Sequence, residues 1–408
     1  MGCGRGEGPR RAVTDSRYAF LAMSLPVRLG LFYSALFVGM GASAPYMPVW
    51  FAHHGLSGAQ IGLILSAPML ARAVTAPAIA IWADSFRLRR TPMIVMGLAA
   101  ATGYALMAAP FGFAWWFCVW FCASAVFSTI GPLTDVLVLS RARRDGFNYG
   151  WPRGIGSAAY IVANVGMGAL VVRYSPDLVL AWIVAAALLA VIGARVLLPP
   201  DPVREGGAAA RFSDGMAGLG GLLRDPVFML AVVSVGLIQS SHAFYYSFSA
   251  LAWRAQGLPE TLTGVLWGVG VAVEIAFMWF LEPWRRVVGP RRLLVLGGCA
   301  AVLRWTALAF SPPLWALFPL QALHCLSFAA TFLASLQLVE RLSTPANASA
   351  AQSINSALSG GVLSGLATMA SGWVFDRAGP HGYFLMTAMS ALGLVGAIRL
   401  YGVRRLDG

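Results

Sequence analysis

Two ionisable side chains, Arg304 and His324, stand inside apolar stretches on either side of a Ser-Pro-Pro break at residues 311–313. Such a break predicts a tight reversal between two membrane-length helices. At about 1.5 Å of rise per residue, both side chains then lie roughly 10–17 Å from the same membrane face. An arginine at that depth is costly unless it is paired or hydrated. We therefore expect the two side chains to be neighbours with a role in packing or function.

Glu274 stands in the middle of another apolar stretch and shares a helical face with Trp267 and Gly270. The protonation of a buried carboxyl group responds to hydration and to a nearby arginine, and a histidine side chain can relay a proton near neutral pH. We predict that Glu274 and His324 carry proton coupling, while Arg304 offers positive charge to a bound solute. The alternative is a static ion pair that fixes helix packing.

Arg72 lies near the middle of a further apolar stretch, too deep for its side chain to reach a membrane face easily. A guanidinium that faces a cavity can hold a carboxylate through two parallel hydrogen bonds, so we predict an anion-binding role. Asp135 and Arg153 lie at predicted helix ends. They either line the inner cavity or form a salt bridge that closes it.

Gln239, His242 and Tyr246 are spaced so that they form a polar stripe on one face of an apolar helix. Aromatic stripes in membrane helices more often serve packing or the membrane interface than ligand binding. The complete set of predicted binding residues is Arg72, Asp135, Arg153, His242, Tyr246, Trp267, Arg304 and Asn355.

Other kinds of chemistry have no support in the sequence. The five cysteines show no metal-ligand spacing. There is also no nucleophile elbow, no metal-spaced histidine set and no phosphate-binding loop. We therefore expect no enzyme activity, no metal and no cofactor, with an ion gradient as the source of energy.

The composition is typical of a protein that lies in a lipid bilayer. Of the 408 residues, 58% are hydrophobic and only 11% are charged, against about 25% charged in soluble domains. The net charge of +13 comes from arginine alone, since the sequence has no lysine. These arginines stand in short loops between apolar segments, so they indicate membrane orientation rather than nucleic-acid binding.

Apolar windows of about 20 residues predict an all-α fold with twelve spanning helices in two groups of six. The first group covers residues 28–51, 57–83, 91–110, 111–140, 155–172 and 178–198, and the second covers 227–250, 262–281, 293–310, 313–339, 351–374 and 383–400. The predicted domains are a tail at 1–25, a bundle at 26–198, a linker at 199–225, a bundle at 226–402 and a tail at 403–408.

The arginines also predict the orientation. The loops on one side of the membrane contain Arg173, Arg254 and Arg377, whereas the loops on the other side and both termini hold most of the remaining arginines. Because the arginine-rich side normally faces the cytoplasm, we expect cytoplasmic termini in a bacterial inner membrane.

The two groups of helices repeat a pattern. The second helix of each group opens with a similar segment, residues 55–62 in the first group and residues 257–264 in the second. Both segments begin with Gly-Leu and end with Gly, which favours duplicated halves. An arginine-rich loop follows each of these helices. In the first half it is led by Asp84 and contains Arg87 and Arg90, and we predict that these three residues form a cytoplasmic gate.

These features resemble the major facilitator superfamily and, within it, the phenylpropionate permease group that is related to lactose permeases. The resemblance is carried by Pro132-Leu133-Thr134-Asp135, Tyr149-Gly150-x-x-Arg153, His242-Ala243-x-Tyr245-Tyr246, Glu274, Arg304-Trp305 and Leu323-His324-Cys325. It implies secondary active transport, commonly as proton symport. Two departures stand out. The basic loop lacks the Gly-Arg continuation of the superfamily, and Ser327 and Phe328 occupy the region where lactose permeases carry an acid beyond the histidine.

We therefore expect a monomeric transporter that takes up a small, aromatic carboxylate together with protons, through rocking of two halves about a central cavity. Its partners would be this solute, protons and the bilayer. Uptake of a neutral nucleoside or sugar, and export of an amphipathic compound, are the alternatives within transport. A membrane sensor that binds a ligand without moving it is a further alternative from another class.

Overall fold

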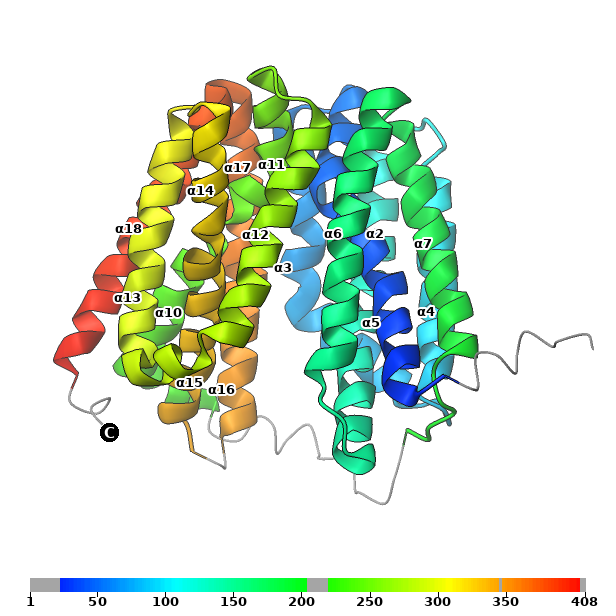
Figure 1. Ribbon diagram of the computed structural model, residues 1–408, viewed down its shortest axis with the longest axis horizontal. Helices are drawn as coiled ribbons and strands as arrows, with labels where there is room; N and C mark the ends of the chain where they lie inside the picture. The colour runs from blue at the N-terminus through cyan, green and yellow to red at the C-terminus, as the bar shows by residue number, and fades with distance from the viewer. Residues whose placement is uncertain (1–22, 204–218, 345–346, 404–408) are drawn as a thin grey trace, which may run out of the picture.

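The computed structural model describes residues 23–203, 219–344 and 347–403, which are almost entirely helical (Figure 1). Ten described segments are long and apolar enough to cross a membrane. The last of these, Ala348–Gly402, contains two spanning helices, and α4 (Arg90–Leu106) adds a slightly shorter one of 17 residues. The described part of the chain therefore has the twelve predicted spanning segments.

The first half contains α2 (Leu25–His53), α3 (Gly58–Ala83), α4, α5 (Phe113–Asp145), α6 (Gly150–Arg173) and α7 (Asp177–Val196). Helix α4 ends before the predicted residue 110, because the indole N–H groups of Trp115 and Trp116 donate to carbonyl groups at its end. Helix α5 continues past the predicted residue 140. Arg141 pairs with Asp145 at 3.3 Å one turn later, and Gly146 then ends the helix in the left-handed conformation.

The second half follows the short helix α9 (Leu219–Arg224), which lies in the predicted linker. Three of its spanning segments are single helices: α12 (Glu260–Phe280), α13 (Glu282–Ala309) and α18 (Tyr383–Arg399). The other three are each made of consecutive elements. They are α10 (Pro226–Ser240) with α11 (Ala243–Ala255); α14 (Leu314–Ala322) with η1 (Cys325–Ala330) and α15 (Thr331–Arg341); and α16 (Ala348–Asn355) with η2 (Ser356–Leu363) and α17 (Ser364–Ala378). Short 3₁₀ turns, η3 (Gly379–Gly382) and η4 (Leu400–Gly402), flank α18. Both η1 and η2 are π-helical turns, which are frequent at functional sites.

The two halves stand side by side and come together at the end that holds the start of α3 (Figure 1). There α3 packs against α17, while α6 packs against α12 and α2 against α11. Gly58, Gly62 and Gly372 bring the backbones of α3 and α17 into contact, so a Cβ atom on Gly372 would collide with the Gly58 carbonyl group. The carboxylate of Asp376 accepts hydrogen bonds from the N–H groups of Gly58 and Ala59 at 2.6 and 2.8 Å. An aspartate of the second half thus caps a helix of the first half.

Candidate functional site

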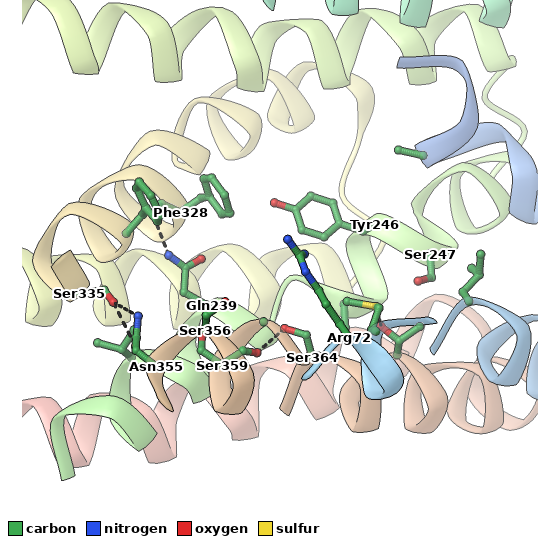
Figure 2. Close-up of a pocket in the computed structure, with 18 of the residues that line it drawn as sticks. Arg72, Gln239, Tyr246, Ser247, Phe328, Ser335, Asn355, Ser356, Ser359 and Ser364 are labelled. Carbon is green, nitrogen blue, oxygen red and sulfur yellow. Dashed lines mark hydrogen bonds between the residues drawn. The ribbon is translucent and has the colours of Figure 1, made fainter. Parts of the chain in front are cut away.

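A cavity of about 560 Å³ lies between the two halves. Helices α2 and α3 of the first half line it, and the second half contributes α10, α11, α15, α16, α17 and the two π-helical turns. Figure 2 shows Gln239, Ser335, Asn355 and Ser359 gathered on the second-half side of this cavity. One wall is therefore lined by uncharged groups that can donate and accept hydrogen bonds.

Arg72 is the charged side chain among the residues that line this cavity. It extends from α3 towards Tyr246 (Figure 2). Its side chain is exposed, and no described residue forms an ion pair or hydrogen bond with it. An unpaired guanidinium at this depth in a membrane protein needs water or a ligand to solvate it. We call this cavity the Arg72 chamber.

A second cavity of about 510 Å³ adjoins the first and shares Tyr246 and Phe328 with it. Glu274, His324 and Trp267 are among the residues that line it. We call this cavity the Glu274 chamber. Two aromatic side chains thus stand at the border between a chamber with a cation and a chamber with a carboxyl group.

Glu274, His324, Arg304 and Gln321 form a connected row of polar side chains. Glu274 Oε2 lies 3.6 Å from His324 Nε2, and Arg304 donates to His324 Nδ1 at 2.9 Å and to Gln321 Oε1 at 2.6 Å. The predicted proximity of Arg304 and His324 is thereby confirmed. Because a guanidinium can only donate, Nδ1 must accept, and the ring proton of His324 lies on Nε2, facing Glu274.

This tautomer has a consequence for proton transfer. While Arg304 donates to Nδ1, His324 has no free nitrogen lone pair that could take a second proton. Glu274 is then the group in this row that can gain or lose a proton in contact with the chamber. Of the two predicted coupling residues, the geometry favours Glu274 as the proton carrier and His324 as the side chain that orients it.

Arg304 is fully buried and lines neither chamber. Its guanidinium lies 4.6 Å from the ring centroid of Tyr245 and 4.5 Å from that of Trp305, so aromatic faces cover it. The structure does not bring Arg304 to a surface where it would touch a solute. His324 also lies between Arg304 and Glu274, so the guanidinium and the carboxyl group do not pair directly.

His242 likewise lies behind the cavity wall, fully buried. Its Nδ1 is 3.0 Å from the carbonyl oxygen of Gln239, and its Nε2 is 3.1 Å from the hydroxyl group of Ser327. A carbonyl oxygen can only accept, so Nδ1 carries the proton and Nε2 accepts from Ser327. His242 therefore ties the junction of α10 and α11 to η1, and the structure does not bring it to either chamber.

The remaining predicted binding residues of the second half do reach the chambers. Tyr246 lines both, Trp267 lines the Glu274 chamber and Asn355 lines the Arg72 chamber. The Trp267 indole N–H is occupied by Ser249 at 3.0 Å, and Asn355 donates to Ser335 at 3.0 Å. The hydroxyl group of Tyr246 has no hydrogen bond to a described residue, so it remains available to a ligand.

Asp135 and Arg153 form a cluster inside the first half and line neither chamber. The hydroxyl groups of Tyr33 and Tyr149 donate to Asp135 Oδ1 at 2.5 and 2.9 Å, and Arg153 Nη1 lies 3.8 Å from the same oxygen. The Arg153 guanidinium also stacks 4.6 Å from the ring centroid of Phe37. Because all these residues come from one half, their salt bridge does not itself join the two halves.

Two of the predicted gate residues, Asp84 and Arg87, lie on the connection between α3 and α4, and the third, Arg90, is the first residue of α4. This connection contacts the residues that follow α7, since the Val203 N–H group donates to the Arg87 carbonyl oxygen at 3.1 Å. Arg90 lines a separate pocket of the first half. The described contacts of this loop are thus within one half, and its role as a gate stays a prediction.

The sequence analysis did not predict the two π-helical turns, and the predicted binding set does not include the side chains that they bring to the cavity. Turn η1 places Phe328 on both chambers, and η2 places Ser356 and Ser359 on the Arg72 chamber. Ser364 follows η2 and lines the same chamber. The available signal was the run of serines and glycines at residues 353–364, which is unusual inside an apolar spanning segment.

Two six-helix halves around a partly polar central cavity define a polytopic membrane transport protein. The sequence model of the MFS_1 like family matches residues 27–386, so the chain belongs to that family. It is a transporter of the major facilitator type and an integral inner membrane protein, not an enzyme.

Two relatives cover most of the chain. A protein of Escherichia coli K12 described as a probable 3-phenylpropionic acid transporter is 28% identical over 368 residues, which are 89% of this chain and 94% of the relative. The maltose permease of Geobacillus stearothermophilus is 30% identical over 360 residues, which are 85% of this chain and 87% of that protein.

Solved structures support the fold. The nucleoside transporter NupG superposes with a TM-score of 0.79 at 15% identity, covering 94% of this chain and 100% of that one. A bacterial homolog of the human lysosomal transporter Spinster, in an inward-facing and unoccupied conformation, gives a TM-score of 0.68 at 13% identity, covering 97% and 98%. At these identities the likeness concerns the fold alone.

Proposed function

We propose that this protein is a proton-coupled symporter that takes up a small aromatic carboxylate. The observation that carries the proposal is the unpaired guanidinium of Arg72 in its chamber. A carboxylate would supply the missing negative charge and could accept two parallel hydrogen bonds. Tyr246 and Phe328, at the border of the two chambers, would flank an aromatic ring.

Glu274 would couple this binding to protons. Its carboxyl group lines the chamber next to that of Arg72, so an ionised Glu274 repels a bound carboxylate and a protonated one does not. Protonation and substrate binding would then favour each other, which is the linkage that a symporter needs. The proton gradient would be the source of energy, with no other cofactor.

The arginine distribution supports an orientation with both termini and the linker in the cytoplasm. The end closed by Asp376, Gly58 and Gly372 would then face outward, and the described conformation would be inward-facing. A topology reporter fused after Asp225 should be active on the cytoplasmic side, and activity on the other side would refute this orientation.

Transport by the purified protein in liposomes tests the proposal. The probe is 3-phenylpropionate, which the name of the Escherichia coli relative suggests. With an acidic outside, the wild type should accumulate the labelled probe, and a proton ionophore should abolish the accumulation. Arg72→Gln should fail to accumulate it, whereas Ser364→Ala in the same chamber should retain most activity. Equal accumulation of the probe with and without the pH gradient would contradict the proposal.

A neutral sugar or nucleoside is the second candidate substrate. It is favoured by the amide groups of Gln239, Gln352 and Asn355 on the chamber wall, and by the relative described as a maltose permease. Gradient-driven uptake of maltose or uridine that survives Arg72→Gln would favour this candidate. Outward movement of the probe would indicate export, and binding without movement would indicate a sensor.

A further inference from the structure

A separate pocket of about 640 Å³ lies in the first half, at the end opposite to the Asp376 contacts. Three of its lining side chains are arginines: Arg28 near the start of α2, Arg90 at the start of α4 and Arg195 near the end of α7. The other lining residues are apolar or carry a hydroxyl group, and no acid is among them. The pocket thus gathers three positive charges.

These charges have no acidic partner among the residues that the structure describes. No described residue forms an ion pair or hydrogen bond with the side chains of Arg28, Arg90 or Arg195, and the Nε atom of Arg28 is shielded from solvent without a partner. Arg141, at the same end of the bundle, instead pairs with Asp201. Arginines at this end can therefore find an acid, and the three around the pocket do not. Their mutual repulsion favours a bound anion.

An apolar surface continues from this pocket along the same helices. Helices α4 and α7 pack together at the edge of the bundle away from the second half (Figure 1). They expose Leu98, Leu189 and Ile192, the last of them at 59%. Ile192 lies about one helical turn from Arg195, so the basic pocket and the apolar strip are adjacent on α7.

We propose that this pocket binds the phosphodiester headgroup of an anionic phospholipid, whose acyl chains lie along α4 and α7. Guanidinium groups pair with phosphate oxygens through parallel hydrogen bonds, and basic pockets at the cytoplasmic side of membrane proteins bind such headgroups. The predicted orientation puts this end in the cytoplasmic leaflet. A free phosphate ion offers the same oxygens but has no acyl chains that could lie along the apolar strip. The proposal does not depend on the solute of the central cavity.

Native mass spectrometry of the full-length protein in a neutral detergent tests this assignment. The probes are phosphatidylglycerol, phosphatidylcholine with the same acyl chains, and inorganic phosphate. The wild type should bind phosphatidylglycerol more tightly than phosphatidylcholine. Combined Arg28→Gln, Arg90→Gln and Arg195→Gln substitutions should weaken phosphatidylglycerol binding by roughly fivefold for each arginine removed, with phosphatidylcholine binding unchanged.

The matched control removes the same charge from exposed arginines that do not line the pocket. Combined Arg143→Gln, Arg292→Gln and Arg341→Gln substitutions should leave phosphatidylglycerol binding close to that of the wild type. Equal losses in both triple variants would overturn the proposal, because they would indicate attraction to net charge alone.

Two further measurements keep the test decisive. Displacement of phosphatidylglycerol by inorganic phosphate at a similar concentration would reveal a site for soluble anions and would also overturn the lipid assignment. If the triple pocket variant does not fold, Arg195→Gln alone changes an exposed residue and should still weaken binding roughly fivefold. Unchanged phosphatidylglycerol binding by this folded single variant would contradict the proposal.

Discussion

The two halves of the molecule each place an arginine deep in a spanning segment, but the two surroundings are opposite. Arg72 of the first half is exposed in a cavity and has no partner among the described residues. Arg304 of the second half is fully buried, donates to His324 and Gln321, and lies beneath the rings of Tyr245 and Trp305.

This difference indicates two roles for an arginine inside a spanning segment, where its charge is energetically costly. The guanidinium of Arg304 is buried and held by two hydrogen bonds through its Nη atoms, so it fixes its neighbours in place. An unpaired guanidinium in a cavity can instead bind an external anion. From this difference we propose that Arg72 binds the substrate and that Arg304 positions His324 and, through it, Glu274. Three experiments test these roles.

The largest expected effect is on energy coupling. Glu274→Gln should abolish uphill accumulation while binding or counterflow stays measurable, because the amide cannot exchange a proton with the chamber. Uptake in liposomes under an imposed pH gradient checks this outcome. Glu340→Gln, which changes an exposed acid outside both chambers, is the control and should accumulate normally. Wild-type accumulation by Glu274→Gln would move coupling to another residue, with Asp135 the next candidate.

The next effect separates stability from affinity. Arg304→Gln should lower the free energy of unfolding by about 3 kcal/mol, because it leaves buried acceptors without their charged donor. Arg72→Gln should leave that free energy nearly unchanged, since Arg72 has no internal partner to lose. Thermal unfolding in detergent measures both. A stable Arg304→Gln protein that binds the carboxylate as weakly as Arg72→Gln would give the two arginines the same role.

The smallest effect concerns the closed end of the molecule. Asp376→Asn should weaken the cap on α3 by about 1 kcal/mol, which shifts a two-state equilibrium roughly fivefold. Distances between spin labels at His53 and Arg377, which are exposed near this end, would show a larger open population. Asp376→Glu keeps the charge and should shift it less. Identical distance distributions in Asp376→Asn and the wild type would show that the glycine contacts close this end without the aspartate.

The sequence predicts the spanning segments well, because each one needs a long apolar window. It also predicts that Arg304 and His324 meet, since a short proline break joins their helices. These features depend on local composition and on chain length. They are therefore accessible without knowledge of packing.

The sequence does not reveal which deep polar residues reach the cavity. The break between α10 and α11 and the π-helical turn η1 rotate side chains away from an even helical register. As a result, His242 turns behind the wall while Tyr246 and Phe328 reach both chambers. Arg304, on α13, is also buried away from both chambers. The cap from Asp376 depends on contact between the two halves, which no local pattern encodes.

The central claim is that Arg72 binds the charge of the substrate, and a thermodynamic cycle tests it most directly. Calorimetric titration would compare an aryl carboxylate with the corresponding neutral amide, in the wild type and in Arg72→Gln. The wild type is predicted to prefer the carboxylate by roughly a hundredfold, and the variant to bind the two compounds alike. A wild-type preference that persists undiminished in Arg72→Gln would contradict the account.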